Sequence, residues 1–281
     1  TARPAEDGSY RVFGQKMFIS GGDHELTDNI VHMVLARIEG APAGVKGISL
    51  FLVPKVLVNE DGSLGARNDV ALAGLLHKMG YRNTTSTVLS FGEKGGAVGY
   101  LVGEANKGLS YMFQMMNEAR IGVALGASVL AYQSYIHALD YARERPQGRL
   151  PGSKDPLAPQ VRIVEHADVR RMLLTMKAFN EGNRALAYHT AKLLDQAHYA
   201  AEEEARADAE AQLAFLTPIC KAFMTDTGLE ATLLGQQVFG GHGFIREWGQ
   251  EQQVRDCRIA PIYEGTNGIQ ALDLLGRKVL G

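Results

Sequence analysis

The hydrophobic pattern of the first hundred residues predicts a series of short strands. Apolar or alternating runs, rich in valine, isoleucine, leucine and phenylalanine, are separated by glycine, aspartate and asparagine. These runs are SYRVFGQKMFIS (9–20), NIVHMVLARIE (29–39), GISLFLVPKVLV (47–58), STVLSFGE (86–93) and GYLVGE (99–104). Several strands at this spacing are typical of a barrel or a sandwich.

After Gly108 the period of the pattern becomes helical. Helices are expected over residues 109–145, 161–197, 203–240 and about 268–280. Strands followed by adjacent long helices indicate an α+β chain, with a partial β-barrel or sandwich domain followed by a C-terminal antiparallel helical bundle. We place the domains at 1–105 and 106–281.

Composition narrows the classes of partner. The 281 residues carry a formal net charge of −2 and no run of lysine or arginine, which argues against a nucleic-acid partner. No apolar run approaches the roughly 18 residues of a membrane span. The two cysteines suit a reducing compartment, so we expect a cytoplasmic protein. The first residue is threonine, and we expect the chain to be part of a longer protein.

One carboxylate has an unusual setting, in the segment APIYEGTNGIQAL (260–272). Glu264 precedes a helix start, for which Asn267 is the expected cap and Gln270 the partner at capping-box spacing. A carboxylate held on such a turn suits a general base. The alternative is a solvated loop glutamate, and the spacing leaves both interpretations open.

Two further stretches have composition that would suit ligand binding. GQQVFGGHGF (235–244) holds four glycines, although a helix end followed by a loop explains Gly240 equally well. FISGG (18–22) ends a strand with an aromatic ring and a hydroxyl group. No nucleotide-binding glycine motif is present, and neither His242 nor EHADVRR (165–171) has a second histidine at metal-ligand spacing. We therefore expect no metal site.

Taken together, these segments resemble the acyl-CoA dehydrogenase family of flavoproteins. The matching blocks occur in the family's order along essentially the whole chain: KMFISGG, GISLFLVP, HKMGYRNTTSTVLSF, YLVGEANKGLSYMF, NEARIGV, YARERPQG, GQQVFGGHGF and RIAPIYEGTNGIQALDLLGRK. The details are similar to the branch near (methylthio)propionyl-CoA dehydrogenases. The family fold has an N-terminal helical domain, a middle β domain and a C-terminal four-helix bundle. The resemblance implies that this chain lacks the first domain and the opening of the β domain.

The resemblance also implies an activity, the FAD-dependent α,β-dehydrogenation of an acyl-CoA thioester to a trans-enoyl-CoA. Glu264 would remove the α-proton, and a hydride would pass from the β-carbon to the flavin N5. Other branches carry the base just before the arginine of NEARI, where this chain has Ala119. Glu118 is one residue earlier and would point about 100° away on a helix.

Further site residues are implied by the same resemblance. The residues expected to bind FAD are Phe18, Ser20, Arg145, Gln237, Gly240, Gly241 and Thr266. Of these, Arg145 and the 237–241 loop would reach the flavin of a neighbouring subunit. The residues expected at the substrate are Arg120, Tyr263 and Gly265, and a structural ion pair is the alternative for Arg120.

The expected partners are acyl-CoA, an electron-transfer flavoprotein or similar acceptor, and further copies of the chain in a dimer or tetramer. Three alternatives stay open: a DNA-associated flavoprotein, an acyl-CoA oxidase, and an inactive flavin-free fragment. We also expect residues 1–281 alone to hold FAD poorly, because binding free energy comes from the whole set of contacts.

Overall fold

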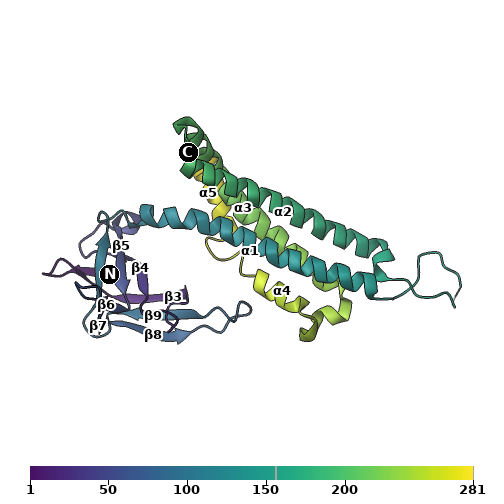
Figure 1. Ribbon diagram of the computed structural model, residues 1–281, viewed down its shortest axis with the longest axis horizontal. Helices are drawn as coiled ribbons and strands as arrows, with labels where there is room; N and C mark the ends of the chain where they lie inside the picture. The colour runs from purple at the N-terminus through teal and green to yellow at the C-terminus, as the bar shows by residue number, and fades with distance from the viewer. Residues whose placement is uncertain (156, 281) are drawn as a thin grey trace. The chain divides into compact units, whose positions relative to one another are not determined.

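The computed structural model describes residues 1–155 and 157–280. It divides the chain into two compact units, a strand-rich unit, Thr1–Met116, and a helical unit, Asn117–Gly281 (Figure 1). Strands end at Val102 and the first long helix begins at Gly108, so that helix starts in one unit and continues into the other. The domain division after residue 105 stays a prediction.

The strand-rich unit holds three antiparallel sheets. Its strands are β1 (Ala2–Pro4), β2 (Tyr10–Val12), β3 (Gly14–Ser20), β4 (Val31–Arg37), β5 (Ile48–Pro54), β6 (Val56–Val58), β7 (Leu64–Arg67), β8 (Val70–Leu75), β9 (Ser86–Phe91) and β10 (Ala97–Val102). The strand orders are β1-β2-β10-β5-β4, β3-β9-β8 and β6-β7. Sequence reasoning missed β1, β7 and β8, because ARP, LGAR and VALAGL hold few of the β-branched and aromatic residues that are typical of strands.

One hydrophobic core joins the two larger sheets. Val12, Val34 and Phe51 face it from the five-stranded sheet, and Leu89 and Phe91 face it from β9. Successive side chains of a strand point to opposite faces, so each sheet contributes alternate residues to this core. The predicted fold class, a partial barrel or sandwich followed by a helical domain, is confirmed.

The helical unit is built on three long helices. They are α1 (Gly108–Glu144), α2 (Ala167–Tyr199) and α3 (Glu203–Val238), followed by the shorter α4 (Gln250–Cys257) and α5 (Asn267–Asp273) and a π-helical segment, Leu274–Val279 (Figure 1). Among the described residues, no helix combines the length and the apolarity that crossing a membrane requires.

The hydrophobic clusters fix the directions of these helices. The end of α1, at Ala138 and Ala142, packs with Met172 near the start of α2 and with Val238 at the end of α3. Nearer its start, Ala124 packs with residues of the later part of α2 and the middle of α3. The helices α1 and α2 are therefore antiparallel, and α3 reverses direction again. The small alanines let the helices approach closely.

Candidate active site

Glu264 lies on a strained turn between α4 and α5. Its φ is +53°, and that of Gly265 is +85°. A left-handed backbone is uncommon for a residue with a Cβ atom, and such strain persists only where the surrounding structure holds it. The half-buried Glu264 is thus carried on a backbone conformation that its neighbours must maintain.

Gln270 holds this turn from inside α5. Its Nε2 donates hydrogen bonds to the carbonyl oxygens of Glu264, at 3.3 Å, and of Gly265, at 3.1 Å. Gln270 is only 1% exposed, so its amide is fixed by packing. A Cβ atom at Gly265 would lie 2.7 Å from that Nε2. Glycine is therefore required at 265 by both the backbone angle and the close approach.

The expected capping box is wrong. The cap of α5 is Thr266, whose Oγ1 accepts a hydrogen bond from the backbone N–H of Ile269 at 3.4 Å. Asn267 is instead the first helical residue, and its side chain bonds to α3. Gln270 is therefore four residues after the cap rather than three, and its Nε2 donates to the two carbonyls of the turn, while its Oε1 accepts no hydrogen bond from the described residues.

The Glu264 carboxylate is only half-buried. In the described part of the chain it makes no hydrogen bond or ion pair, and the backbone N–H of Glu264 has no acceptor. A general base needs a free carboxylate within reach of its proton, and a developing oxyanion needs a free donor. On α1, Glu118 and Ala119 are exposed, and Arg120 is buried.

Arg120 makes a buried ion pair within the helical unit. Its Nη1 lies 2.9 Å from Oδ2 of Asp273, the last residue of α5, and the two side chains are 7% and 8% exposed. The Nε of Arg120 is buried and has no hydrogen-bond partner among the described residues. This geometry favours the structural alternative for Arg120 over a direct contact with substrate.

The expected flavin contacts of the helical unit form two separate groups. Thr266 and Tyr263 lie beside Glu264, near the Arg120 end of α1. Arg145, Gln237, Gly240 and Gly241 are exposed and lie at the other end, where Tyr141 stacks on Phe239 at 4.1 Å and its hydroxyl lies 3.0 Å from His242 Nδ1. Since a helix rises about 1.5 Å per residue, the 21 residues between Arg120 and Tyr141 separate the groups by about 30 Å.

In the strand-rich unit, Phe18 lies on a bulge of β3. Lys16 pairs with Leu89 and Ile19 pairs with Thr87, so Met17 and Phe18 together oppose one residue of β9. Phe18 has φ +61° and is 74% exposed. Ser20, also exposed, ends the same strand. A bulge that aims an aromatic ring outward is a typical feature beside binding sites.

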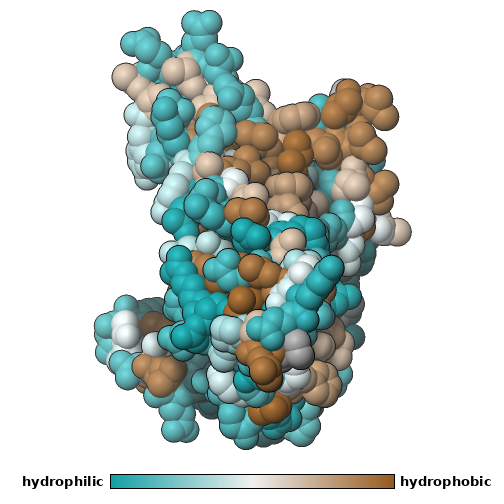
Figure 2. Space-filling model, turned by 90° about the vertical axis from the view of Figure 1, so that its right-hand side faces the viewer, coloured by the Kyte–Doolittle hydropathy of each residue, from teal (hydrophilic) through white to brown (hydrophobic). Residues whose placement is uncertain are grey.

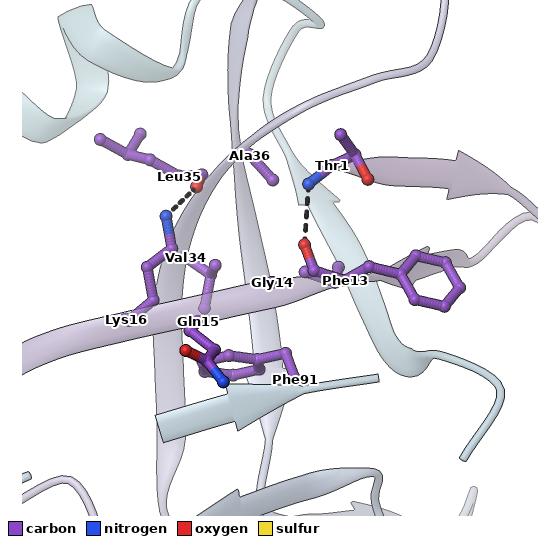
Figure 3. Close-up of a pocket in the computed structure, with 10 residues that line it drawn as sticks. Thr1, Phe13, Gly14, Gln15, Lys16, Val34, Leu35, Ala36 and Phe91 are labelled. Atoms are coloured by element: carbon purple, nitrogen blue, oxygen red, sulfur yellow. Dashed lines mark hydrogen bonds between the residues drawn. The ribbon is translucent and has the colours of Figure 1, made fainter. Parts of the chain in front are cut away.

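A cavity of about 190 Å³ in the strand-rich unit does not contain any of the expected site residues. Figure 3 shows its lining, in which the Lys16 ammonium donates to the carbonyl of Leu35 and the Thr1 amino group donates to that of Phe13. Burial lowers the pKa of Lys16 from its usual value. The cavity is thus distinct from the candidate site.

Sequence reasoning missed the buried polar residues Asp273 and Lys221. It named Gln270, but not its hydrogen bonds to the carbonyls of the Glu264 turn. Lys221 is 0% exposed, and burial lowers the pKa of its ammonium to about 8. A signal was present in the sequence, because the lysine of TPICKAFM interrupts an apolar helical stretch.

Neither cysteine is a candidate nucleophile. Cys220 and Cys257 are free and buried. Burial raises the pKa of the Cys220 thiol to about 11 and that of Cys257 to about 12, so both are protonated thiols near neutral pH. Over residues 1–155 and 157–280, no group of three or more histidine, cysteine, aspartate or glutamate side chains could hold a metal ion.

Comparison with known protein families decides the relationship. Residues 106–280 match the model of the acyl-CoA dehydrogenase C-terminal domain. The chain belongs to the acyl-CoA dehydrogenase family. It is 50% identical to 3-methylmercaptopropionyl-CoA dehydrogenase of Ruegeria pomeroyi over 281 residues, covering 100% of this chain and 47% of that protein. It is 43% identical to a butyryl-CoA dehydrogenase of Syntrophomonas wolfei over 276 residues, covering 96% of this chain and 45% of that protein.

Solved structures agree with this relationship. An acyl-CoA dehydrogenase from Bacillus anthracis, solved with FAD, has a TM-score of 0.78 at 25% identity and covers 98% of this chain and 43% of its own. Caenorhabditis elegans ACDH-11, solved with C11-CoA, has a TM-score of 0.79 at 26% identity, and the match covers 98% of this chain and 42% of ACDH-11. The resemblance predicted from the sequence is confirmed. The chain spans about half the length of the curated relatives that it matches.

Proposed function

We propose that the full-length protein is an FAD-dependent acyl-CoA dehydrogenase in which Glu264 is the base. The Cα–H bond of the acyl thioester breaks and its proton passes to the Glu264 carboxylate. The Cβ–H bond breaks with transfer of a hydride, and a trans Cα=Cβ double bond forms. FAD, when bound, supplies the hydride acceptor at its N5. The observation that carries this proposal is the Glu264 carboxylate, which makes no hydrogen bond or ion pair with the described residues and lies on a turn that Gln270 holds by two hydrogen bonds.

The turn also supplies a donor for the thioester oxygen. Removal of the α-proton places negative charge on that oxygen, which a fixed hydrogen-bond donor stabilises. The backbone N–H of Glu264 has no acceptor within the described residues, so it is free for this task. We assign Tyr263 and Gly265 to the same acyl pocket, because they flank the base. Arg120 supports the pocket through Asp273.

The residues present fit a flavin. Phe18 offers an exposed ring for the flavin face, and Ser20 offers an exposed hydroxyl group for its edge. Thr266 is exposed at the start of α5, where a helix N-terminus favours polar or anionic groups. Arg145 is an exposed cation suited to a pyrophosphate, and Gly240 and Gly241 let backbone approach the adenine end.

We propose that two copies of the chain complete each flavin site. The roughly 30 Å between the Glu264 turn and the Arg145 end of α1 supports this, because one chain would serve two different flavins. Large apolar side chains are also exposed on the helical unit: Leu174, Tyr188, Leu233, Phe244 and Leu272. Figure 2 shows apolar side chains, in brown, gathered in patches on the face that it presents. Such patches mark surfaces that bind protein partners.

For substrate we propose short, linear acyl-CoA thioesters, since the relatives at 50% and 43% identity are named for 3-methylmercaptopropionyl-CoA and butyryl-CoA. For the acceptor we propose an electron-transfer flavoprotein. A relative from Acetobacterium woodii, 29% identical over 268 residues, is named as a subunit of a caffeyl-CoA reductase–Etf complex.

The experiment that tests this function is anaerobic addition of acyl-CoA to the purified full-length protein. We expect the flavin absorbance to bleach with butyryl-CoA or 3-methylmercaptopropionyl-CoA and to recover on addition of an electron-transfer flavoprotein. Recovery with oxygen alone at a comparable rate would indicate an oxidase. No bleaching with any acyl-CoA would contradict the proposal.

A further inference from the structure

Lys221 is a charged side chain in the interior of the helical unit. It lies on α3 and is 0% exposed, next to the buried Cys220 and near the buried Met224. Lysine is almost never fully buried, because removing an ammonium group from water is costly unless it is paired. No ion pair within 4.0 Å joins Lys221 to a carboxylate among the described residues. Its Nζ instead donates to Oδ1 of Asn267 at 2.9 Å.

The Asn267 amide is held from both of its ends. Its oxygen faces Lys221, while its Nδ2 donates to Oδ1 of Asp226 at 2.7 Å and to Oγ1 of Thr225 at 3.0 Å. A cation can only donate and a carboxylate can only accept, so this pair permits one orientation of the amide. Bonds to charged groups are also the stronger kind. Two oppositely charged residues of α3 thus clamp one side chain at the start of α5.

This clamp is close to Glu264 in sequence and in space. Asn267 is the first residue of α5, three residues after Glu264. Burial is the largest effect on the pKa of Lys221 and lowers it. The negative charges of Asp226 and Glu264 raise this pKa, and the positive charge of Arg120 lowers it. Lys221 therefore lies near enough to the candidate base for their charges to interact. Gln270 ties the turn independently, through backbone carbonyls.

We propose that Lys221 is a positioning residue for Glu264: by holding the amide of Asn267 against α3, it fixes the turn on which the base is carried. The inference rests on the proposed role of Glu264 as base. A displacement of reacting groups by about 1 Å can cost on the order of 100-fold in rate. An anchor one helical turn away can therefore control the rate without touching substrate.

The kinetic test compares Lys221→Met with Asn267→Ala and the double variant in the full-length protein. Lys192→Met, which changes an exposed lysine of α2, is the matched control. We expect each single change to lower the rate of flavin reduction about 10- to 100-fold with little change in the dissociation constant of acyl-CoA. If Lys221 acts through Asn267, the double variant is no slower than the slower single variant. Multiplicative losses, or a Lys221→Met rate within threefold of the parent, would overturn the proposal.

A second measurement does not depend on the reaction. Amide hydrogen exchange of Tyr263 and Asn267, whose N–H groups donate to the carbonyls of Ile259 and Pro261, should become at least tenfold faster in both single variants and stay unchanged in Lys192→Met. If no acyl-CoA reduces the parent flavin, the proposed function fails, yet the exchange data still decide the role of Lys221. Unchanged exchange in Lys221→Met would overturn that role. Should Lys221→Met fail to fold, Asn267→Ala alone carries both tests, because Asn267 is only half-buried.

Discussion

Replacing Arg120 by methionine should destabilise the helical unit strongly. The Arg120–Asp273 pair is 2.9 Å long and nearly excluded from water, and Arg120→Met would leave the Asp273 carboxylate buried without its main partner. Breaking one side of a buried pair costs about 3–5 kcal/mol. For a unit of this size each kcal/mol lowers Tm by about 2–4 °C, so we expect a fall of roughly 10 °C.

The same carboxylate provides the control. Arg277 lies 3.3 Å from the other oxygen of Asp273 but is 67% exposed, and such surface pairs contribute less than about 1 kcal/mol. Arg277→Gln should therefore shift Tm by about 3 °C or less, and Arg120→Met with Asp273→Leu should recover most of the loss. Thermal unfolding of the full-length protein at fixed protein and FAD concentrations measures all three. If Arg120→Met leaves Tm unchanged and instead raises the KM for acyl-CoA, Arg120 acts on the substrate and the ion-pair argument is refuted.

Three further predictions concern the turn, the buried lysine and the assembly. Gly265→Ala should slow flavin reduction at least tenfold, because the added Cβ would lie 2.7 Å from Gln270 Nε2 on a backbone with φ +85°. The control is Gly268→Ala, whose Cβ would lie 3.9 Å from Thr266 Oγ1 and which should retain the parent rate. Equal rates of flavin reduction in the two variants would contradict this. Burial lowers the pKa of Lys221 from 10.5 to about 8, so between these pH values the unfolded state binds more protons and the free energy of unfolding rises with pH, by at most roughly 3 kcal/mol. Denaturant unfolding of Lys221→Met should lack this rise. A variant with the same pH profile as the parent would refute the assignment of the rise to Lys221. Light scattering should show the full-length flavoprotein as a dimer or tetramer, and a flavin-saturated monomer would contradict this. Residues 1–281 alone should purify with little FAD, and a stoichiometric FAD content would contradict that expectation.

The sequence predicted those features that depend on local pattern. The short apolar or alternating runs of the first hundred residues and the long helical periods of α1, α2 and α3 predicted the order of strands and helices, and the resemblance singled out Glu264. The strands β1, β7 and β8 were missed because they hold few β-branched or aromatic residues. Glu264 was expected ahead of a helix start, and it lies there.

Contacts between distant residues could not be predicted. The partner of Arg120 is 153 residues away, and that of Lys221 is 46 residues away, so both depend on how the helices pack. The cap of α5 was assigned to Asn267 because Asn267 and Gln270 have capping-box spacing, but the cap is Thr266. The Asn267 side chain instead accepts a hydrogen bond from Lys221 of α3, and Gln270 Nε2 donates to the carbonyl of Glu264. The left-handed backbone of Phe18 likewise depends on its pairing with β9.

The central claim, that Glu264 is the base, is tested most directly by stopped-flow measurement of flavin reduction in Glu264→Gln of the full-length protein. The amide keeps the shape of the side chain but cannot accept a proton, and loss of a general base costs about 10²–10⁴ in rate. Neither Ala119 nor the exposed Glu118 provides a substitute on α1. We predict that flavin reduction falls at least 100-fold while acyl-CoA still binds with nearly the parent affinity. Reduction within tenfold of the parent rate would show that Glu264 is not the base.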